Sequence, residues 1–330
     1  MSETRSREIE LAQQLLGIPR NNDFEIVERV IPAPSAGELL VKNLYMSVDP
    51  YMRGSFGDMV GEVWNGGCVG KVIYSKFEEF GEGEYVVGNQ GWREYYLSDG
   101  SDVIKIKDPF APLHAYLGAL GMPGRTAYVG LLDIGQPEKG ETVFVSAASG
   151  AVGSIVCQIA RIKGCRVVGS AGSDEKVAWL LNEARIDSAF NYKRSESLEE
   201  ELEERCPDGI DVYYDNVGGE HLDAALVHMN QFGRIPLCGM ISTYNSKEPP
   251  PGPSNLMLAV RKRLTLQGFI VSDHSDRFPQ FYEDMRRWVA EGLITWRETI
   301  VQGLENAPGA FIQLFTGGNF GKMIVQIADE

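Results

Sequence analysis

The sequence reads Ala147-Ala148-Ser149-Gly150-Ala151-Val152-Gly153 at the point where a strand pattern changes into a helix pattern. Before it, Thr142–Ser146 is a short, β-branched, apolar run, which is typical of a buried parallel strand. After it, Ser154–Lys163 carries its apolar residues at helical spacing. We therefore predict a strand, a glycine-containing turn and a helix in succession.

This succession is the context that a dinucleotide-binding turn needs. A helix N-terminus offers free N–H groups and the positive end of the helix dipole to a pyrophosphate. We expect Gly150 to let the backbone approach the phosphates, and Gly153 to let the helix pack closely on the strand. Ala148 stands at the first glycine position, so the match is A-x-G-x-x-G. The alternative interpretation is a tight turn that binds nothing.

Strand and helix patterns alternate regularly from Gly140 onward, which indicates a doubly wound parallel sheet and an α/β fold. The further strands that we expect are Cys165–Ser170, Ala189–Tyr192, Ile210–Tyr214, Arg234–Cys238 and Leu264–Val271. The further helices that we expect are Asp174–Ala184, Ser197–Arg205, His221–Met229 and Arg277–Glu291.

Residues 1–120 show short β segments between turn residues and no long helical pattern, which predicts a small antiparallel barrel or distorted sandwich. The tail Thr295–Glu330 returns to short β segments around a helix at Ala307–Phe315, and we expect it to rejoin the first domain. The predicted domains are thus 1–120, completed by 295–330, and a nucleotide-binding domain of 121–294. The strands expected in the first are Phe24–Val30, Glu38–Tyr45, Val69–Tyr74, Tyr85–Val87, Trp92–Leu97 and Val103–Ile106.

The bulk composition excludes several classes of protein. The net charge is −15 and the pI is about 4.8, which argues against nucleic acid or an anionic membrane as a partner. No run reaches the roughly 18 apolar residues of a membrane span, and the polar N-terminus does not resemble a signal peptide. The five cysteines form no C-x-x-C pair, which favours a reducing cytoplasm over a disulfide framework.

The cofactor preference follows from the end of the second predicted strand. An NAD-binding site carries an acidic residue there for the ribose 2′-hydroxyl, but Val168–Ala171 contains none. Lys176 follows closely and could reach a 2′-phosphate, so we predict NADP(H) as the cofactor. The alternative interpretation of Lys176 is an exposed helix lysine. His221 and His228 lie on one predicted helix, and neither has a Cys or Glu neighbour at ligand spacing. We interpret all four histidines as surface or core residues and predict no metal.

Further stretches carry a family resemblance: Met46–Gly54, Ala147–Ser154, Gly172–Lys176, Asp215–Gly219, Cys238–Asn245 and Glu305–Pro308. Together they resemble the medium-chain dehydrogenase/reductase superfamily, in its zinc-free branch of leukotriene B4 dehydrogenase/prostaglandin reductase and NADPH-dependent alkenal double-bond reductases. The resemblance spans nearly the whole chain, and it implies a Rossmann domain and a GroES-like β-barrel substrate domain. Zinc-dependent relatives carry G-H-E-x-x-G where this chain has Gly66 and Gly67 in place of His and Glu. The segment from Arg53 to Asn65 looks shorter than in typical members, and it should border the substrate cleft.

The resemblance also implies roles for individual residues. Lys176 and Tyr192 would hold the 2′-phosphate, and Tyr51 would wall the substrate pocket. The segment Leu264–Val271 would pair across the two-fold of a homodimer, which would cover an exposed sheet edge. The remaining cofactor contacts would come from Gly150, Ala151, Val152, Gly153, Ser154, Asn216, Cys238, Gly239, Ile241, Ser242, Tyr244, Phe269, Ile270, Val271 and Asn319.

The implied activity is NADPH-dependent reduction of the C=C bond of an α,β-unsaturated ketone or aldehyde, without a metal. The enolate oxygen that develops needs hydrogen-bond donors, and the candidates are the nicotinamide ribose hydroxyl and a tyrosine, with Tyr244 ahead of Tyr51. No histidine or cysteine is evidently poised as a general acid, so water is the expected proton source. Two alternatives are NADPH-dependent quinone reduction on the same fold and a non-catalytic NADPH-binding protein.

Overall fold

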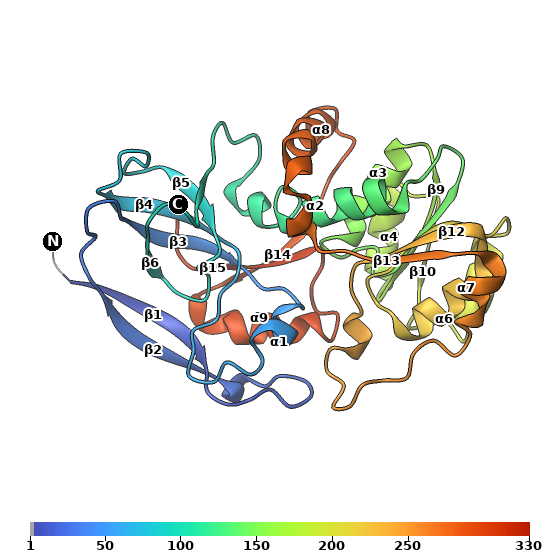
Figure 1. Cartoon of the computed structure of the whole chain (residues 1–330), viewed down its shortest axis with the longest axis horizontal. Helices are drawn as coiled ribbons and strands as arrows, with labels where there is room; N and C mark the ends of the chain where they lie inside the picture. The colour runs from blue at the N-terminus through green and yellow to red at the C-terminus, as the bar shows by residue number, and fades with distance from the viewer. Residues whose placement is uncertain (1–2) are drawn as a thin grey trace. The chain divides into compact units, whose positions relative to one another are not determined.

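The computed structural model describes residues 3–330, which divide into two compact units (Figure 1). The first unit comprises the chain up to Leu117 together with Glu298–Asn319 and Met323–Glu330. The second unit comprises Gly118–Arg297 and Phe320–Lys322. No helix among the described residues is long and apolar enough to cross a membrane.

A six-stranded parallel sheet forms the centre of the second unit, in the order β10-β9-β8-β11-β12-β13. Numbered along the chain this is 3-2-1-4-5-6, the order of a Rossmann sheet, which confirms the predicted fold class. The order reverses between β8 and β11, and ligands bind at such a reversal in open α/β sheets. The strands are β8 (Thr142–Val145), β9 (Arg166–Ala171), β10 (Ser188–Asn191), β11 (Ile210–Tyr214), β12 (Met229–Leu237) and β13 (Thr265–Gly268).

The helices of the second unit mostly start and end within a few residues of the prediction. They are α2 (Met122–Val129), α3 (Gly153–Ile162), α4 (Asp174–Asn182), α5 (Leu198–Arg205), α6 (Gly219–His228), α7 (Met257–Lys262) and α8 (Phe278–Ala290). The predicted last strand, Leu264–Val271, was too long, because Phe269 and Ile270 leave the sheet and Val271 opens a short helical turn. The six-residue α7 was not predicted, since its mostly apolar residues show no polar face.

A larger sheet dominates the first unit, in the order β14-β15-β3-β4-β5-β7, with β6 paired to β3. Its β3 pairs antiparallel with β15, β4 and β6. Two strands, β14 and β15, therefore come from the C-terminal segment. The elements are β1 (Thr4–Leu11), β2 (Phe24–Ile31), β3 (Leu39–Ser47), α1 (Met52–Phe56), β4 (Cys68–Ser75), β5 (Tyr85–Gly88), β6 (Tyr95–Ser98), β7 (Ile104–Lys105), β14 (Glu298–Gln302), α9 (Ala307–Leu314) and β15 (Lys322–Gln326).

The antiparallel pair β1–β2 shows where the sequence pattern misleads, since β1 was not predicted. Ser6 and Glu8 of β1 are buried, so polar residues occupy the positions where an apolar alternation would signal a strand. The core beneath is aromatic: the ring of Trp64 lies 5.1 Å from those of Phe24 and Trp92 and 5.2 Å from Phe311 of α9, all in edge-to-face contact.

Candidate active site

The turn between β8 and α3 is shaped by close backbone contacts. Ala147 adopts a positive φ of 48°, and the Gly150 N–H donates to its carbonyl oxygen at 2.9 Å. A Cβ at Gly153 would stand 2.4 Å from that same oxygen and 2.9 Å from the Cα of Ala148. Only glycine fits at position 153, as the sequence predicts, because these neighbours are backbone atoms that cannot swing away.

Ala148, at the first position of the A-x-G-x-x-G pattern, is accommodated by a glycine on the neighbouring strand β9. Ala148 is fully buried, and its N–H donates to the carbonyl of Ser170 on β9 at 2.9 Å. A Cβ at Gly169 of β9 would stand 2.7 Å from the Cβ of Ala148. The methyl group of Ala148 therefore occupies space that Gly169 leaves open, and the turn keeps its close approach to β9.

A buried polar network sits at the switch point, where β8 and β11 end. The Asp215 carboxylate accepts hydrogen bonds from the Tyr213 hydroxyl at 2.7 Å and from the N–H groups of Val217 and Gly218 at 3.0 and 2.8 Å. Asn216 donates from its side chain to the carbonyl of Ser146 at 2.8 Å. Burial raises the pKa of Asp215. The network holds the loop that carries Asn216, and the structural roles of Asp215, Tyr213 and Ser146 were not predicted.

Two lysines and a tyrosine gather beside the end of β9. A Cβ at Gly172 would lie 3.3 Å from Lys193 Cε and 3.4 Å from the Tyr192 hydroxyl. Burial, and then the nearby charge of Lys193, lowers the pKa of Lys176. Lys176 lies on α4, where its N–H donates to the capping hydroxyl of Ser173 at 3.3 Å. This group of Lys176, Tyr192 and Lys193, called the cationic cluster below, can hold an anion; Lys193 was missed.

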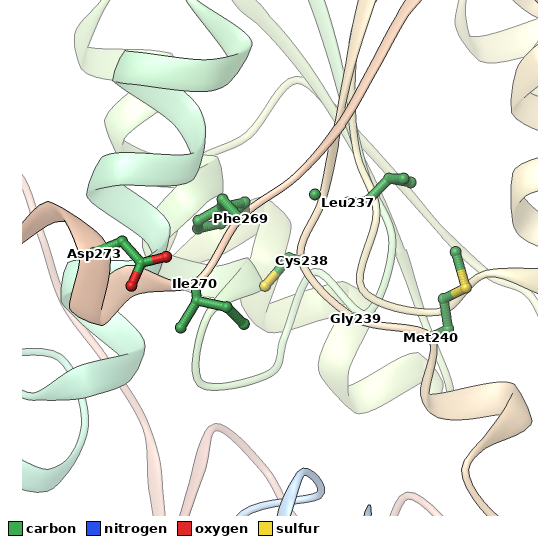
Figure 2. Close-up of a pocket in the computed structure, with 8 residues that line it drawn as sticks. Leu237, Cys238, Gly239, Met240, Phe269, Ile270 and Asp273 are labelled. Atoms are coloured by element: carbon green, nitrogen blue, oxygen red, sulfur yellow. The ribbon is translucent and has the colours of Figure 1, made fainter.

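A pocket of about 430 Å³ opens at the carboxyl ends of β12 and β13 (Figure 2). The predicted residues Cys238, Gly239, Phe269 and Ile270 line it. Figure 2 shows Cys238, Phe269 and Ile270 close together on the segments that follow β12 and β13, while the Met240 side chain lies to the other side. The lining that was not predicted comprises Leu237, Gly268 and Asp273.

The remaining predicted residues lie next to these groups or in the first unit. The Tyr244 hydroxyl accepts a long hydrogen bond from the Met240 N–H at 3.4 Å, and burial raises its pKa. The Ser242 hydroxyl donates to the Val217 carbonyl at 2.6 Å, which ties the turn containing Ile241 to the loop after β11. Tyr51 directly precedes α1 in the first unit and is 39% exposed, and Asn319 also belongs to that unit. The roles of Tyr51 and Asn319 stay predictions.

The cysteines and histidines carry no reactive constellation. All five cysteines are unpaired, four are buried, and burial raises the pKa of the pocket thiol of Cys238 to about 12. Within residues 3–330, no group of three or more His, Cys, Asp or Glu side chains is placed to hold a metal ion. His221 is buried, and its Nε2 lies 3.1 Å from the Ser170 hydroxyl.

His221 makes stability depend on pH. Burial lowers its pKa from 6.5 to about 4, so between these pH values His221 is protonated in the unfolded chain and neutral in the folded chain. The free energy of unfolding is therefore expected to fall between pH 6.5 and pH 4, by about 3 kcal/mol at most from this group. Urea unfolding of the protein and of His221→Gln at several pH values measures the difference. If the free energy of unfolding of the wild type ran parallel to that of His221→Gln between pH 6.5 and pH 4, the prediction would be wrong. His114 does not disturb this comparison. Its hydrogen bond to Glu298 raises its pKa, so it contributes with the opposite sign, and it does so equally in both proteins.

Two protein families match the chain. Residues 7–106 match the family described as the N-terminal domain of oxidoreductase, and residues 151–289 match the family described as zinc-binding dehydrogenase. The chain is 47% identical to prostaglandin reductase 1 of Bos taurus (96% of this chain, 97% of the relative). It is 43% identical to NADPH-dependent curcumin reductase of Escherichia coli (99% and 98%) and to the NADP(+)-dependent 2-alkenal reductase of Nicotiana tabacum (99% and 99%). A solved structure, CurA of Vibrio vulnificus in complex with NADPH, aligns with a TM-score of 0.93 at 44% identity, over 98% of this chain and 100% of that one.

Proposed function

The chain belongs to the medium-chain dehydrogenases/reductases, in their zinc-independent branch of alkenal and prostaglandin reductases, and from this membership we propose that it reduces the C=C bond of α,β-unsaturated ketones and aldehydes with NADPH. It is an NADP-dependent oxidoreductase acting on C=C bonds. The observation that carries the proposal is the glycine turn at the switch point of a Rossmann sheet, flanked by the cationic cluster and an open pocket.

The residues present fit NADPH. Gly150 and Gly153 keep the turn free of side chains where a pyrophosphate would lie against Ala151, Val152 and Ser154. The cationic cluster would hold the 2′-phosphate, and no carboxylate from the end of β9 opposes it. The ribose and nicotinamide would lie against Asn216, Cys238, Gly239, Ile241, Ser242, Tyr244, Phe269, Ile270, Val271 and Asn319. When bound, NADPH supplies the hydride that the β-carbon of the substrate takes up.

The protein's own residues are proposed to position the substrate and to donate hydrogen bonds to it. Because burial raises the pKa of Tyr244, its hydroxyl stays protonated at working pH and can donate to the enolate oxygen. Tyr51 is proposed as a wall of the substrate pocket and as a second donor, with the first unit as the substrate domain. Water would deliver the proton to the α-carbon. Binding and orientation, rather than a metal or a general acid, would supply most of the catalysis.

The test is consumption of NADPH with a 2-alkenal, an enone and a quinone, each repeated with NADH. Rapid alkene reduction with NADPH and slow reduction with NADH is the expected result. Preferential turnover of the quinone would replace the proposal with quinone reduction. Tight NADPH binding without turnover of any acceptor would mark a non-catalytic protein.

Tyr244→Phe is expected to lower kcat for an enone by about tenfold to a hundredfold, because one donor to the enolate oxygen is lost. NADPH affinity should change little, since the ring remains in place. Steady-state kinetics with fluorescence titration of NADPH checks both values. Tyr282→Phe on α8 is the matched control. Unchanged enone turnover in Tyr244→Phe would remove Tyr244 from the mechanism.

We also propose that the chain forms a homodimer through β13. This strand ends the parallel sheet, and Thr265, Gln267 and Gly268 are exposed along it. An uncovered edge of this kind pairs readily with another strand, and a second copy offers the same edge. Light scattering in solution should give twice the chain mass of 36.5 kDa. A mass of one chain at micromolar concentration would contradict the dimer.

Five unpaired cysteines in an enzyme of this kind are the basis for proposing a cytoplasmic location.

A further inference from the structure

A histidine lies behind the tyrosine of the cationic cluster and has no part in the mechanism above. His221, in the first turn of α6, is only 6% exposed. Its ring centre lies 5.1 Å from that of Tyr192 at an interplanar angle of 78°, in edge-to-face contact. Its Nε2 lies 3.1 Å from the hydroxyl of Ser170 on β9. These two contacts therefore hold the imidazole against the ring of Tyr192.

We infer that His221 is a positioning residue that sets the affinity for the 2′-phosphate of NADP(H) by holding the Tyr192 ring in place. The inference rests on the proposed role of Tyr192 in binding that phosphate. The Tyr192 hydroxyl is close to Gly172, beside Lys193, so its position depends on what supports the ring from behind. Without the imidazole, the ring can sink into the space left at His221 and draw its hydroxyl away from the lysines.

The support acts by contact rather than by charge. Burial lowers the pKa of His221 to about 4, so the imidazole is neutral at working pH and adds nothing to the attraction for a phosphate. The same Ser170 that binds His221 accepts the N–H of Ala148 through its carbonyl group. Ser170 thereby connects the turn between β8 and α3 to His221, because both contact this one residue of β9.

Two substitutions separate the two contacts. His221→Gln keeps an amide that can reach Ser170 but removes the ring, whereas His221→Phe keeps a ring against Tyr192 but removes the hydrogen bond. His228 lies seven residues further along the same helix, so His228→Gln is a matched control. The measured quantities are the Kd of NADPH and of NADH, by fluorescence titration without an acceptor, and kcat.

His221→Gln is expected to raise the Kd of NADPH by about threefold to tenfold, the size of an aromatic contact, and to leave the Kd of NADH and kcat unchanged. His221→Phe should restore most of the NADPH affinity. His228→Gln should match the wild type for both cofactors. In a Tyr192→Leu background, adding His221→Gln should change neither Kd further, because the ring that His221 supports is gone.

Equal weakening of NADPH and NADH by His221→Gln would show a general structural role and overturn the inference, as would no change in either Kd. If His221→Gln does not fold, His221→Leu takes its place: it fills the buried position without an aromatic ring, and the expected weakening again falls on NADPH alone. These titrations need no substrate. A failure of the enone-reductase proposal would therefore be seen in the turnover assays and would not change the cofactor affinities measured here.

Discussion

Gly153→Ala is expected to cost at least a hundredfold in NADPH affinity and in kcat/KM. The added methyl carbon would stand 2.4 Å from the Ala147 carbonyl oxygen and 2.9 Å from the Ala148 Cα. To relieve this contact α3 has to move away from β8, which displaces the N–H groups proposed to bind the pyrophosphate. Overpacking of this kind also costs about 1–3 kcal/mol of stability. Fluorescence titration of NADPH and thermal unfolding measure the two effects separately.

The matched control is Gly309→Ala in the first turn of α9, where no heavy atom lies within 4 Å of the added carbon. It should keep wild-type NADPH affinity and gain up to about 1 kcal/mol, because alanine favours a helix over glycine. A Gly153→Ala protein that bound NADPH as tightly as Gly309→Ala would mean that the close contact at Gly153 does not shape the phosphate-binding turn.

The turn around Gly153 was predictable because its evidence is local: a β-branched run, glycines at fixed spacing and a helical pattern follow one another within about twenty residues. The close fit between Ala148 and Gly169 was not predictable, because it joins the turn after β8 to β9, which only the folded sheet brings together. The Asp215 network was not predicted for the same reason, since its partner Ser146 directly follows β8 and nothing in the spacing signals their contact.

The cationic cluster shows the same division. Lys176 could be inferred from its distance along the chain after β9, and Tyr192 came from the family resemblance. Lys193 needed the structure, because only the side-by-side pairing of β9 with β10 places the end of β10 beside Gly172. The strand β1 was not predicted because its buried positions include the polar residues Ser6 and Glu8. Asp273 was not predicted as a pocket residue because the expected strand ran on to Val271, where the structure begins a short helical turn.

The double variant Lys176→Ala/Lys193→Ala is expected to raise the KM for NADPH by about a hundredfold and to leave the KM for NADH unchanged. A hydrogen bond to a charged group contributes about 1.5–3 kcal/mol, so each lysine accounts for about tenfold or more. The charge of Lys193 adds to burial in lowering the pKa of Lys176, and Lys193 lies beside Gly172 at the end of β9, so the two charges can act on one phosphate. Each single variant should therefore lose about tenfold, with the larger loss at the more buried Lys176.

Ionic strength supplies a second measurement that a purely structural defect would not reproduce. Added salt screens exposed charges, so it should weaken NADPH binding to the wild type more than NADH binding, and this difference should shrink in the double variant. Lys163→Ala, at the opposite end of α3 from the glycine turn, is the control and should behave as the wild type. If the double variant lost NADH and NADPH equally, the two lysines would stabilise the nucleotide domain rather than select the phosphate. If only NADPH suffered, the absence of an acid at Val168–Ala171 and the presence of these lysines would together account for the cofactor preference.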